Sequence, residues 1–125
     1  MDDRIRRALA NGQVIDITTT GRRSNETRRI EIVFHNFGGR LYITGMPRAD
    51  RTRAWLLNLE ADPHFTFHLK GPVAADLAAT ARIITDETER RTVFAEVVEV
   101  WRGQDIETMT RSSPLIEVLL DDLAA

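Results

Sequence analysis

Short segments in which apolar and polar residues alternate are the feature that most constrains how this chain folds. The segment Arg29–Phe37 alternates most regularly and places three apolar residues on one face. A period of two is typical of a half-buried β-strand. The pair Gly38-Gly39 follows, and two glycines supply the positive φ angles that a tight hairpin turn needs. The sequence therefore predicts a strand, a hairpin turn and a second strand over Arg40–Thr44.

The remaining strands are predicted from β-branched or alternating residues at Gln13–Thr20, His64–Lys70, Val73–Thr85 and Pro114–Leu120. The last segment also fits a helix, but its proline and its Ile-Glu-Val pattern favour a strand. Helical spacing of apolar residues predicts helices over Asp2–Asn11, Arg53–Glu60 and from an Asp86 N-cap to about Trp101. Six strands and three helices over residues 1–125 predict one α+β domain, built on a small antiparallel barrel or sheet.

The side chains that usually carry chemistry are sparse. The chain has 125 residues and no cysteine, which excludes disulfides and thiolate sites. His64 and His68 have the spacing of a metal pair on a helix, but on a strand about 13 Å would separate them. With His35 standing alone, we expect barrel-wall histidines and no metal. The dinucleotide, phosphate-loop and serine-nucleophile motifs are missing. The catalytic residue stays unknown, and an enzyme of this sequence would depend on a cofactor.

Arginine is concentrated in the middle of the chain. The net charge is -2, yet residues 21–53 contain eight arginines against three acidic residues. Six of them form two groups. The first, at the turn before Arg29–Phe37, consists of Arg22, Arg23 and Arg28. The second, at the start of the Arg53–Glu60 helix, consists of Arg48, Arg51 and Arg53. A helix N-terminus attracts anions, so the two groups predict a phosphate or carboxylate site. A solvated basic surface is the alternative. Strand alternation explains the nearby aromatic residues, so we expect no nucleic-acid partner.

The sequence shows no targeting or membrane-spanning segment. Its first ten residues are charged and lack the apolar run of a signal peptide. No segment approaches the roughly 18 consecutive apolar residues of a transmembrane helix. We therefore expect a cytoplasmic protein.

Several motifs resemble those of the deazaflavin-dependent nitroreductase family, a branch of the flavin/deazaflavin oxidoreductases. They are the Thr-Thr-Thr-Gly-Arg-Arg-Ser run at residues 18–24, Arg28, the Gly-Gly-Arg at residues 38–40, and the run from Trp55 to Pro63, which is the most specific. The resemblance covers about residues 13–95. It implies a split β-barrel fold in which reduced coenzyme F420 passes a hydride to a small electron-poor acceptor, such as a quinone, an enone or a nitroaromatic.

The resemblance also implies, by position, which residues bind the cofactor. Those matched to its phosphate and tail are Arg22, Arg23, Ser24 and Arg28. Those matched to its ring are Ile32 and Val33 behind it, and Thr44, Gly45, Met46, Pro47, Ala54 and Trp55 opposite. Where the family commonly has a Ser-Lys pair, this chain has Met46-Pro47, and Arg48 or Arg51 would substitute for the lysine charge.

Other departures limit what the resemblance implies. Glu31 replaces a usual proline and would repel an anionic cofactor unless it faces an arginine. Residues 101–111 contain no tyrosine, whereas some members place tyrosines over the substrate, so substrate identity does not transfer. Two alternatives stay open: an FMN-binding or pyridoxamine-oxidase-like member, and a non-catalytic binder of a fatty acid, haem or another small anion. A homodimer is implied by the resemblance alone.

Overall fold

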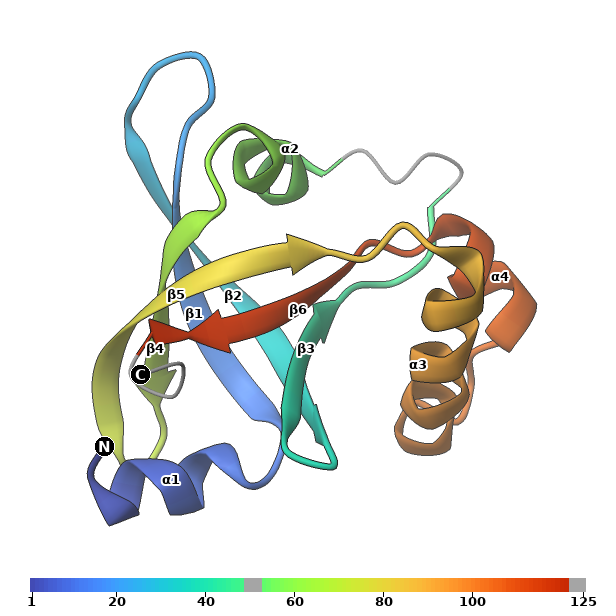
Figure 1. Cartoon of the computed structure of the whole chain (residues 1–125), viewed down its shortest axis with the longest axis horizontal. Coiled ribbons are helices and arrows are strands. Elements are labelled where there is room, and N and C mark those ends of the chain that lie inside the picture. Colours follow the sequence, from blue (N-terminus) through green and yellow to red (C-terminus); the bar gives the residue numbers. More distant parts are fainter. Residues whose placement is uncertain (49–52, 122–125) are drawn as a thin grey trace.

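Six strands close into an antiparallel barrel in the computed structural model, which describes residues 1–48 and 53–121 (Figure 1). In chain order they are β1 (Gln13–Thr20), β2 (Thr27–Phe37), β3 (Arg40–Thr44), β4 (His64–Lys70), β5 (Ala74–Ile83) and β6 (Leu115–Leu120). Around the barrel the order is β1-β2-β3-β6-β5-β4, and β4 pairs with β1 to close it. The six predicted strands are confirmed, including the last, where the sequence also fitted a helix.

Apolar side chains at alternate strand positions fill the barrel. Ile15 and Ile17 of β1 are fully buried, as are Phe34 of β2 and Phe67 of β4. The two phenylalanine rings meet edge to face with their centroids 5.2 Å apart, a favoured aromatic geometry. Thr19 continues the inward row of β1 and is also buried. The row thus changes from apolar to polar at the end of β1, on the side of the barrel where the candidate site lies.

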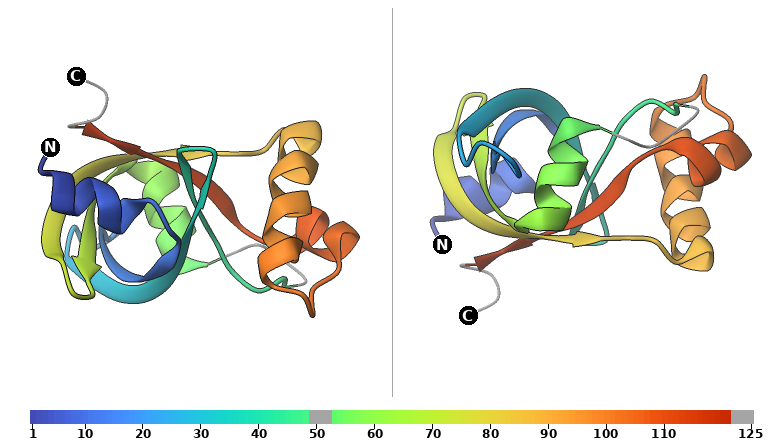
Figure 2. Two further views of the ribbon diagram at one scale, coloured as in Figure 1. Left: turned by 90° about the horizontal axis from the view of Figure 1, so that it is seen from below. Right: turned by 90° about the horizontal axis from the view of Figure 1, so that it is seen from above.

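Two helices cover the ends of the barrel and two pack beside it. Helix α1 (Asp3–Leu9) lies across one end and α2 (Ala54–Ala61) across the other, as the views from below and above show (Figure 2). Both contribute to the barrel core, α2 mainly through Trp55 and Leu59. Helices α3 (Glu87–Val100) and α4 (Ile106–Ser112) share a second, smaller core beside the barrel. In the described ranges, no helix combines the length and apolar character needed to cross a bilayer.

The prediction of three helices is wrong, because α4 forms a fourth. This helix has seven residues and carries little apolar periodicity of its own. Its N-cap is Asp105, whose carboxylate accepts a hydrogen bond from the Thr108 backbone N–H at 2.9 Å. At its other end, the guanidinium of Arg90 donates to backbone carbonyls of α4. A short helix that depends on tertiary contacts is difficult to predict from local sequence patterns.

The predicted turns and caps are largely confirmed. Gly38 and Gly39 have φ angles of 64° and 91°, as the hairpin requires. Asp86 caps α3 by accepting from the Glu89 backbone N–H at 2.9 Å. The Glu89 side chain binds Arg82 instead of completing the capping box. Strand β2 begins at Thr27, two residues earlier than predicted, so Arg28 lies on a strand rather than in the turn.

Candidate cofactor site

A cavity of about 350 Å³ is lined in part by α2. This helix lies across one end of the barrel (Figure 2). Its lining comes from β1, β2, the segment before α2 and α2 itself, and consists of Thr19, Arg28, Ile30, Arg48, Arg53, Ala54, Trp55 and Asn58. The alternation of β2 places its arginine and its isoleucine on one face. Apolar and cationic groups therefore share one wall, which suits a ligand with an apolar ring and an anionic group.

The arginines of this cavity have no ion-pair partner within 4.0 Å among residues 1–48 and 53–121. Elsewhere in the protein, by contrast, Arg29, Arg82 and Arg91 each pair with a carboxylate. Arg28 and Arg48 are also exposed, so an incoming ligand reaches them. Like charges gathered at one cavity repel one another, and a bound anion would remove that repulsion.

The N-terminus of α2 adds a second source of positive potential. Its N-cap is Arg53, whose side chain makes no capping bond, and the first turn contains no acidic residue. The hydrogen bond from the Leu57 backbone N–H to the Arg53 carbonyl marks the beginning of the helical ladder. The N–H groups before Leu57 thus have no capping side chain. Free N–H groups and the positive end of the helix dipole together bind anions.

Arg53 itself is held in an electrostatically costly position. One of its terminal nitrogens donates to the Met46 carbonyl, while the other, Nη1, is buried without a hydrogen-bond partner in the described part of the chain. The guanidinium packs closely on Gly45, where a Cβ atom would lie 3.1 Å from Arg53 Cζ. Burial, and secondarily repulsion from Arg48, lowers the pKa of Arg53. An anion beside this cation would offset both costs.

Asn58 joins helix α2 to the turn that carries Arg22. Its side chain is only 3% exposed. The Oδ1 atom accepts from the Arg22 backbone N–H at 3.2 Å and lies 3.4 Å from Arg22 Nη1. The Nδ2 atom donates to Thr19 Oγ1 at 3.2 Å. Through these contacts α2 fixes the turn that follows β1, and Arg22 comes to lie next to the cavity.

The structure brings part of the predicted site together. The predicted residues that line the cavity are Arg28, Arg48, Arg53, Ala54 and Trp55. Arg22 joins them through Asn58. Gly45 and Met46 act on the cavity indirectly, because both contact the Arg53 guanidinium. The convergence of the two arginine groups on one site, predicted from their positions in the chain, is therefore seen in the fold. Arg51 lies outside the described residues.

The other predicted residues lie outside the cavity lining. Arg23 and Ser24 are exposed in the turn after β1, where Ser24 Oγ accepts from the Glu26 backbone N–H at 3.2 Å. Ile32 is half-buried against the barrel core, and the side chain of Thr44 donates to the Pro114 carbonyl. The last two are Pro47, which is half-buried, and Val33, which lines a separate hollow with His35 and Trp101.

Sequence reasoning missed three lining residues. Thr19 and Ile30 lie on predicted strands. The sequence does not indicate at which end of the barrel the cavity forms, so these two residues could not be assigned to it. Asn58 left a clearer signal. It is a polar residue on the inner face of a helix whose neighbouring inward residues, Trp55 and Leu59, are apolar. A buried amide needs hydrogen-bond partners, which is why this position connects elements distant in sequence.

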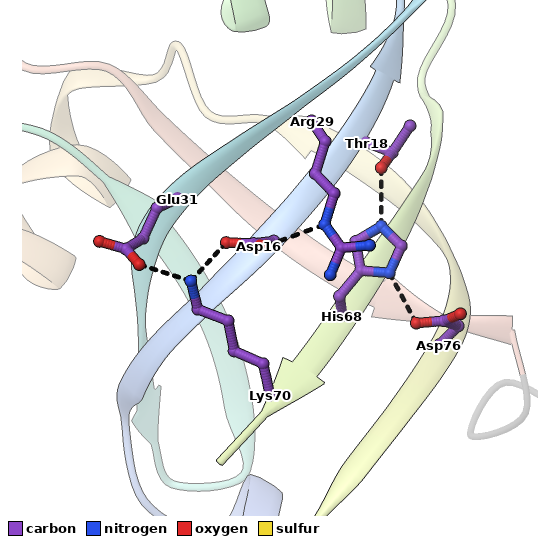
Figure 3. A network of polar contacts seen from close by, with 7 residues as sticks. All are labelled: Asp16, Thr18, Arg29, Glu31, His68, Lys70 and Asp76. Carbon is purple, nitrogen blue, oxygen red and sulfur yellow. Dashed lines mark hydrogen bonds and ion pairs between the residues drawn. The ribbon is translucent and has the colours of Figure 1, made fainter.

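Glu31 belongs to the outer wall and does not oppose an anion in the cavity. Its carboxylate accepts from Lys70 Nζ at 2.5 Å, and the same Nζ donates to Asp16 at 2.7 Å (Figure 3). Asp16 in turn accepts from Arg29 Nε at 2.8 Å. The cation that Glu31 faces is thus a lysine, and no arginine is needed to offset its charge. All three histidines lie on wall strands, as predicted.

Comparison with known proteins identifies the family. The family described as F420H(2)-dependent quinone reductase matches residues 2–121. The chain belongs to this family. Its cofactor is therefore F420, and its reaction is hydride transfer from F420H2 to an acceptor. This match favours the F420-dependent enzyme over the two alternatives, an FMN-binding member and a non-catalytic binder. The predicted resemblance to deazaflavin-dependent reductases is confirmed.

Three solved structures share the fold of this chain. A putative pyridoxamine 5'-phosphate oxidase from Listeria innocua is 18% identical, with a TM-score of 0.69 over 95% of this chain and 92% of that chain. An F420-H2 dependent reductase is 22% identical, with a TM-score of 0.59 over 84% and 92%. A protein that forms a domain-swapped dimer is 20% identical, with a TM-score of 0.63 over 93% and 94%. These likenesses confirm the split β-barrel fold.

Proposed function

We propose that the cavity beside α2 binds the anionic part of F420. The observation that carries this proposal is the meeting of arginines without ion-pair partners and an uncapped helix N-terminus at one cavity. Arg28, Arg48 and Arg53 would hold the phosphate and tail together with the first N–H groups of α2. The buried Nη1 atom of Arg53, which has no described partner, supports the fit of an anion here.

The chain contributes binding and orientation rather than acid or base groups. Bound reduced F420 supplies the hydride from its deazaflavin ring. The residues that line the described cavity include no aspartate, glutamate, histidine or tyrosine that could donate a proton. Trp55, Ile30 and Ala54 form an apolar wall that excludes water from a bound ring. Holding the ring carbon and the acceptor side by side against an apolar wall is the form of catalysis that such a lining supports.

We propose a small electron-poor molecule, such as a quinone, as the acceptor. The family description supports a quinone, and the open, partly apolar cavity would admit a planar ring beside the cofactor. Enones and nitroaromatics share the same electron-poor character and are the further candidates.

Inorganic phosphate tests the anion site directly. Oxidation of F420H2 by benzoquinone would be followed by the absorbance of the cofactor, with phosphate as a competitor. We expect phosphate to raise the KM for F420H2 and to leave kcat unchanged, because it competes for the arginines and not for the ring. Sodium chloride at matched ionic strength is the control, since it screens charges without occupying the site. Equal effects of the two salts would contradict the proposal.

Asn58→Ala should weaken F420 binding by about tenfold, because Arg22 loses its hydrogen bonds to the Asn58 side chain. Such a contact contributes about 1–2 kcal/mol to the binding free energy. The KM for F420H2 and the urea midpoint of unfolding would both be measured. The matched control is Thr19→Val, which removes the Nδ2 partner and leaves the Arg22 contacts in place. An increase in KM as large in the control as in Asn58→Ala would mean that the Arg22 contacts of Asn58 do not account for the weaker binding.

We also propose that the chain forms a homodimer. A protein of the same fold forms a domain-swapped dimer, and this chain exposes apolar side chains at Val14 and Val100 that a partner would cover. Sedimentation of the purified protein should give the mass of a dimer. A monomer at micromolar concentration would contradict this proposal without affecting the assignment of the cofactor site.

A further inference from the structure

Three side chains on the outer wall form a chain of hydroxyl, imidazole and carboxylate groups (Figure 3). Thr18 Oγ1 lies 2.7 Å from His68 Nε2, and His68 Nδ1 lies 2.7 Å from Asp76 Oδ1. These are the contacts that join a nucleophile, its base and the group that orients the base in hydrolytic enzymes. No step of the F420 reaction uses them.

The strand register of the barrel brings the three residues together. His68 of β4 lies directly opposite Asp76 of β5. On the other side of β4, Thr18 of β1 lies opposite Thr66, two residues from His68. Side chains two apart on a strand share a face, so Thr18, Thr66 and His68 all belong to the outer wall. Thr19 faces the cofactor cavity instead, which separates the two sites.

The contacts fix where the protons lie. The hydrogen bond from His68 holds the pKa of Asp76 below its usual range, so its carboxylate is an acceptor and His68 Nδ1 is the donor. In the neutral imidazole Nε2 is then the acceptor, and the Thr18 hydroxyl donates to it. The Thr18 proton is thus directed at a base that can take it.

The imidazole is held in place, and the residue that carries the hydroxyl is half-buried. His68 is only 6% exposed and is bonded at both nitrogens, which locks its ring. Thr18 is half-buried, so a small molecule can reach it. Arg29 lies opposite Thr18 on β2, and its Nε is tied to Asp16. Its two terminal nitrogens have no hydrogen bond with a described residue, and the Arg29 charge also lowers the pKa of Asp76, so the guanidinium would be available to a negative charge that develops beside Thr18.

We propose that Thr18, His68 and Asp76 form a second reactive centre in which Thr18 accepts an acyl group from an activated ester. Thr18 Oγ1 attacks the carbonyl carbon of the ester, and its proton passes to His68 Nε2. The bond from that carbon to the leaving oxygen then breaks, and the alcohol or phenol leaves with the proton. The acyl group stays on Thr18 Oγ1 as a new ester, and no atom changes oxidation state.

The test uses p-nitrophenyl acetate with the full chain. Release of p-nitrophenol would be followed over time, and the acetylated residue would be located by mass spectrometry of peptides. Thr66 is a control within the same molecule. It lies opposite Thr18 and is half-buried like it, but among the described residues its hydroxyl has no hydrogen bond to an imidazole nitrogen. We expect Thr18 to be acetylated faster than Thr66.

Two variants complete the test. Thr18→Val keeps the side-chain shape and should abolish acetylation at this position. Asp76→Asn changes a side chain that is 74% exposed, so the fold should be retained, and it should slow acetylation of Thr18 by about 100-fold or more. Urea midpoints would verify folding of both variants. Acetylation of Thr18 no faster than that of Thr66, or an unchanged rate in Asp76→Asn, would overturn the proposal.

Discussion

Replacing Arg28 and Arg48 together by alanine should weaken F420 binding by roughly 100-fold. Both side chains line the cavity and neither has an ion-pair partner in the described ranges, so their charge is available to the ligand. A hydrogen bond to a charged group contributes about 1.5–3 kcal/mol, and two at the lower end give about 3 kcal/mol. The dissociation constant would be measured by titration against F420 fluorescence.

The matched control for this double variant is Arg4→Ala with Arg7→Ala. These two arginines lie on α1 at the other end of the barrel, so the control removes the same charge far from the cavity (Figure 1). General electrostatic attraction would weaken binding equally in both double variants. A specific anion site predicts a loss only for Arg28 and Arg48, with unchanged urea midpoints because both side chains are exposed. Equal losses would contradict the site.

Replacing Arg90 by leucine should destabilise the fold more than any other change considered for this protein. Arg90 is only 3% exposed. Its guanidinium donates to four backbone carbonyls, those of Ile84, Met109, Thr110 and Ser113. Without these donors the carbonyls lose their hydrogen bonds to Arg90, and each such bond contributes about 1 kcal/mol net. We expect the free energy of unfolding to fall by about 3–5 kcal/mol, measured by urea denaturation.

Arg91→Leu is the matched control for this prediction. Arg91 is the next residue on α3, but its side chain is 44% exposed and its partners, Glu87 and Glu107, are exposed carboxylates. Surface ion pairs contribute little to stability, so little or no loss is expected. Arg90→Lys would keep the charge but bind fewer carbonyls, and should fall between the two. A loss in Arg91→Leu equal to that in Arg90→Leu would mean that the carbonyl contacts are not what stabilises α4.

Local pattern was sufficient to predict the strands of this fold. Alternation in Arg29–Phe37 and the glycine pair after it determine a hairpin almost without help from the rest of the chain, because both the period and the positive φ angles are local properties. Helix α4 could not be predicted in this way. Its seven residues depend on Arg90, which lies on another helix, and no local pattern encodes that contact.

The candidate site was partly predictable for a similar reason. The two arginine groups are visible in the sequence, and so is the helix start at which one of them lies. Their convergence depends on Asn58, whose side chain joins α2 to the turn after β1, and on the closure of the barrel. Val33 shows the opposite case. The family resemblance places Val33 with Ile32 behind the cofactor ring. Neighbouring residues on a strand face opposite sides, however, and Val33 lines the hollow beside Trp101.

A crystal structure of the protein with F420 tests the central claim most directly. The proposed site predicts that the cofactor phosphate lies within about 3 Å of guanidinium nitrogens of Arg28, Arg48 or Arg53, and near the first N–H groups of α2. The ring should then contact Trp55 or Ile30. A cofactor phosphate bound away from these arginines, such as in the hollow between Leu57 and Arg90 on the other side of α2, would contradict the account.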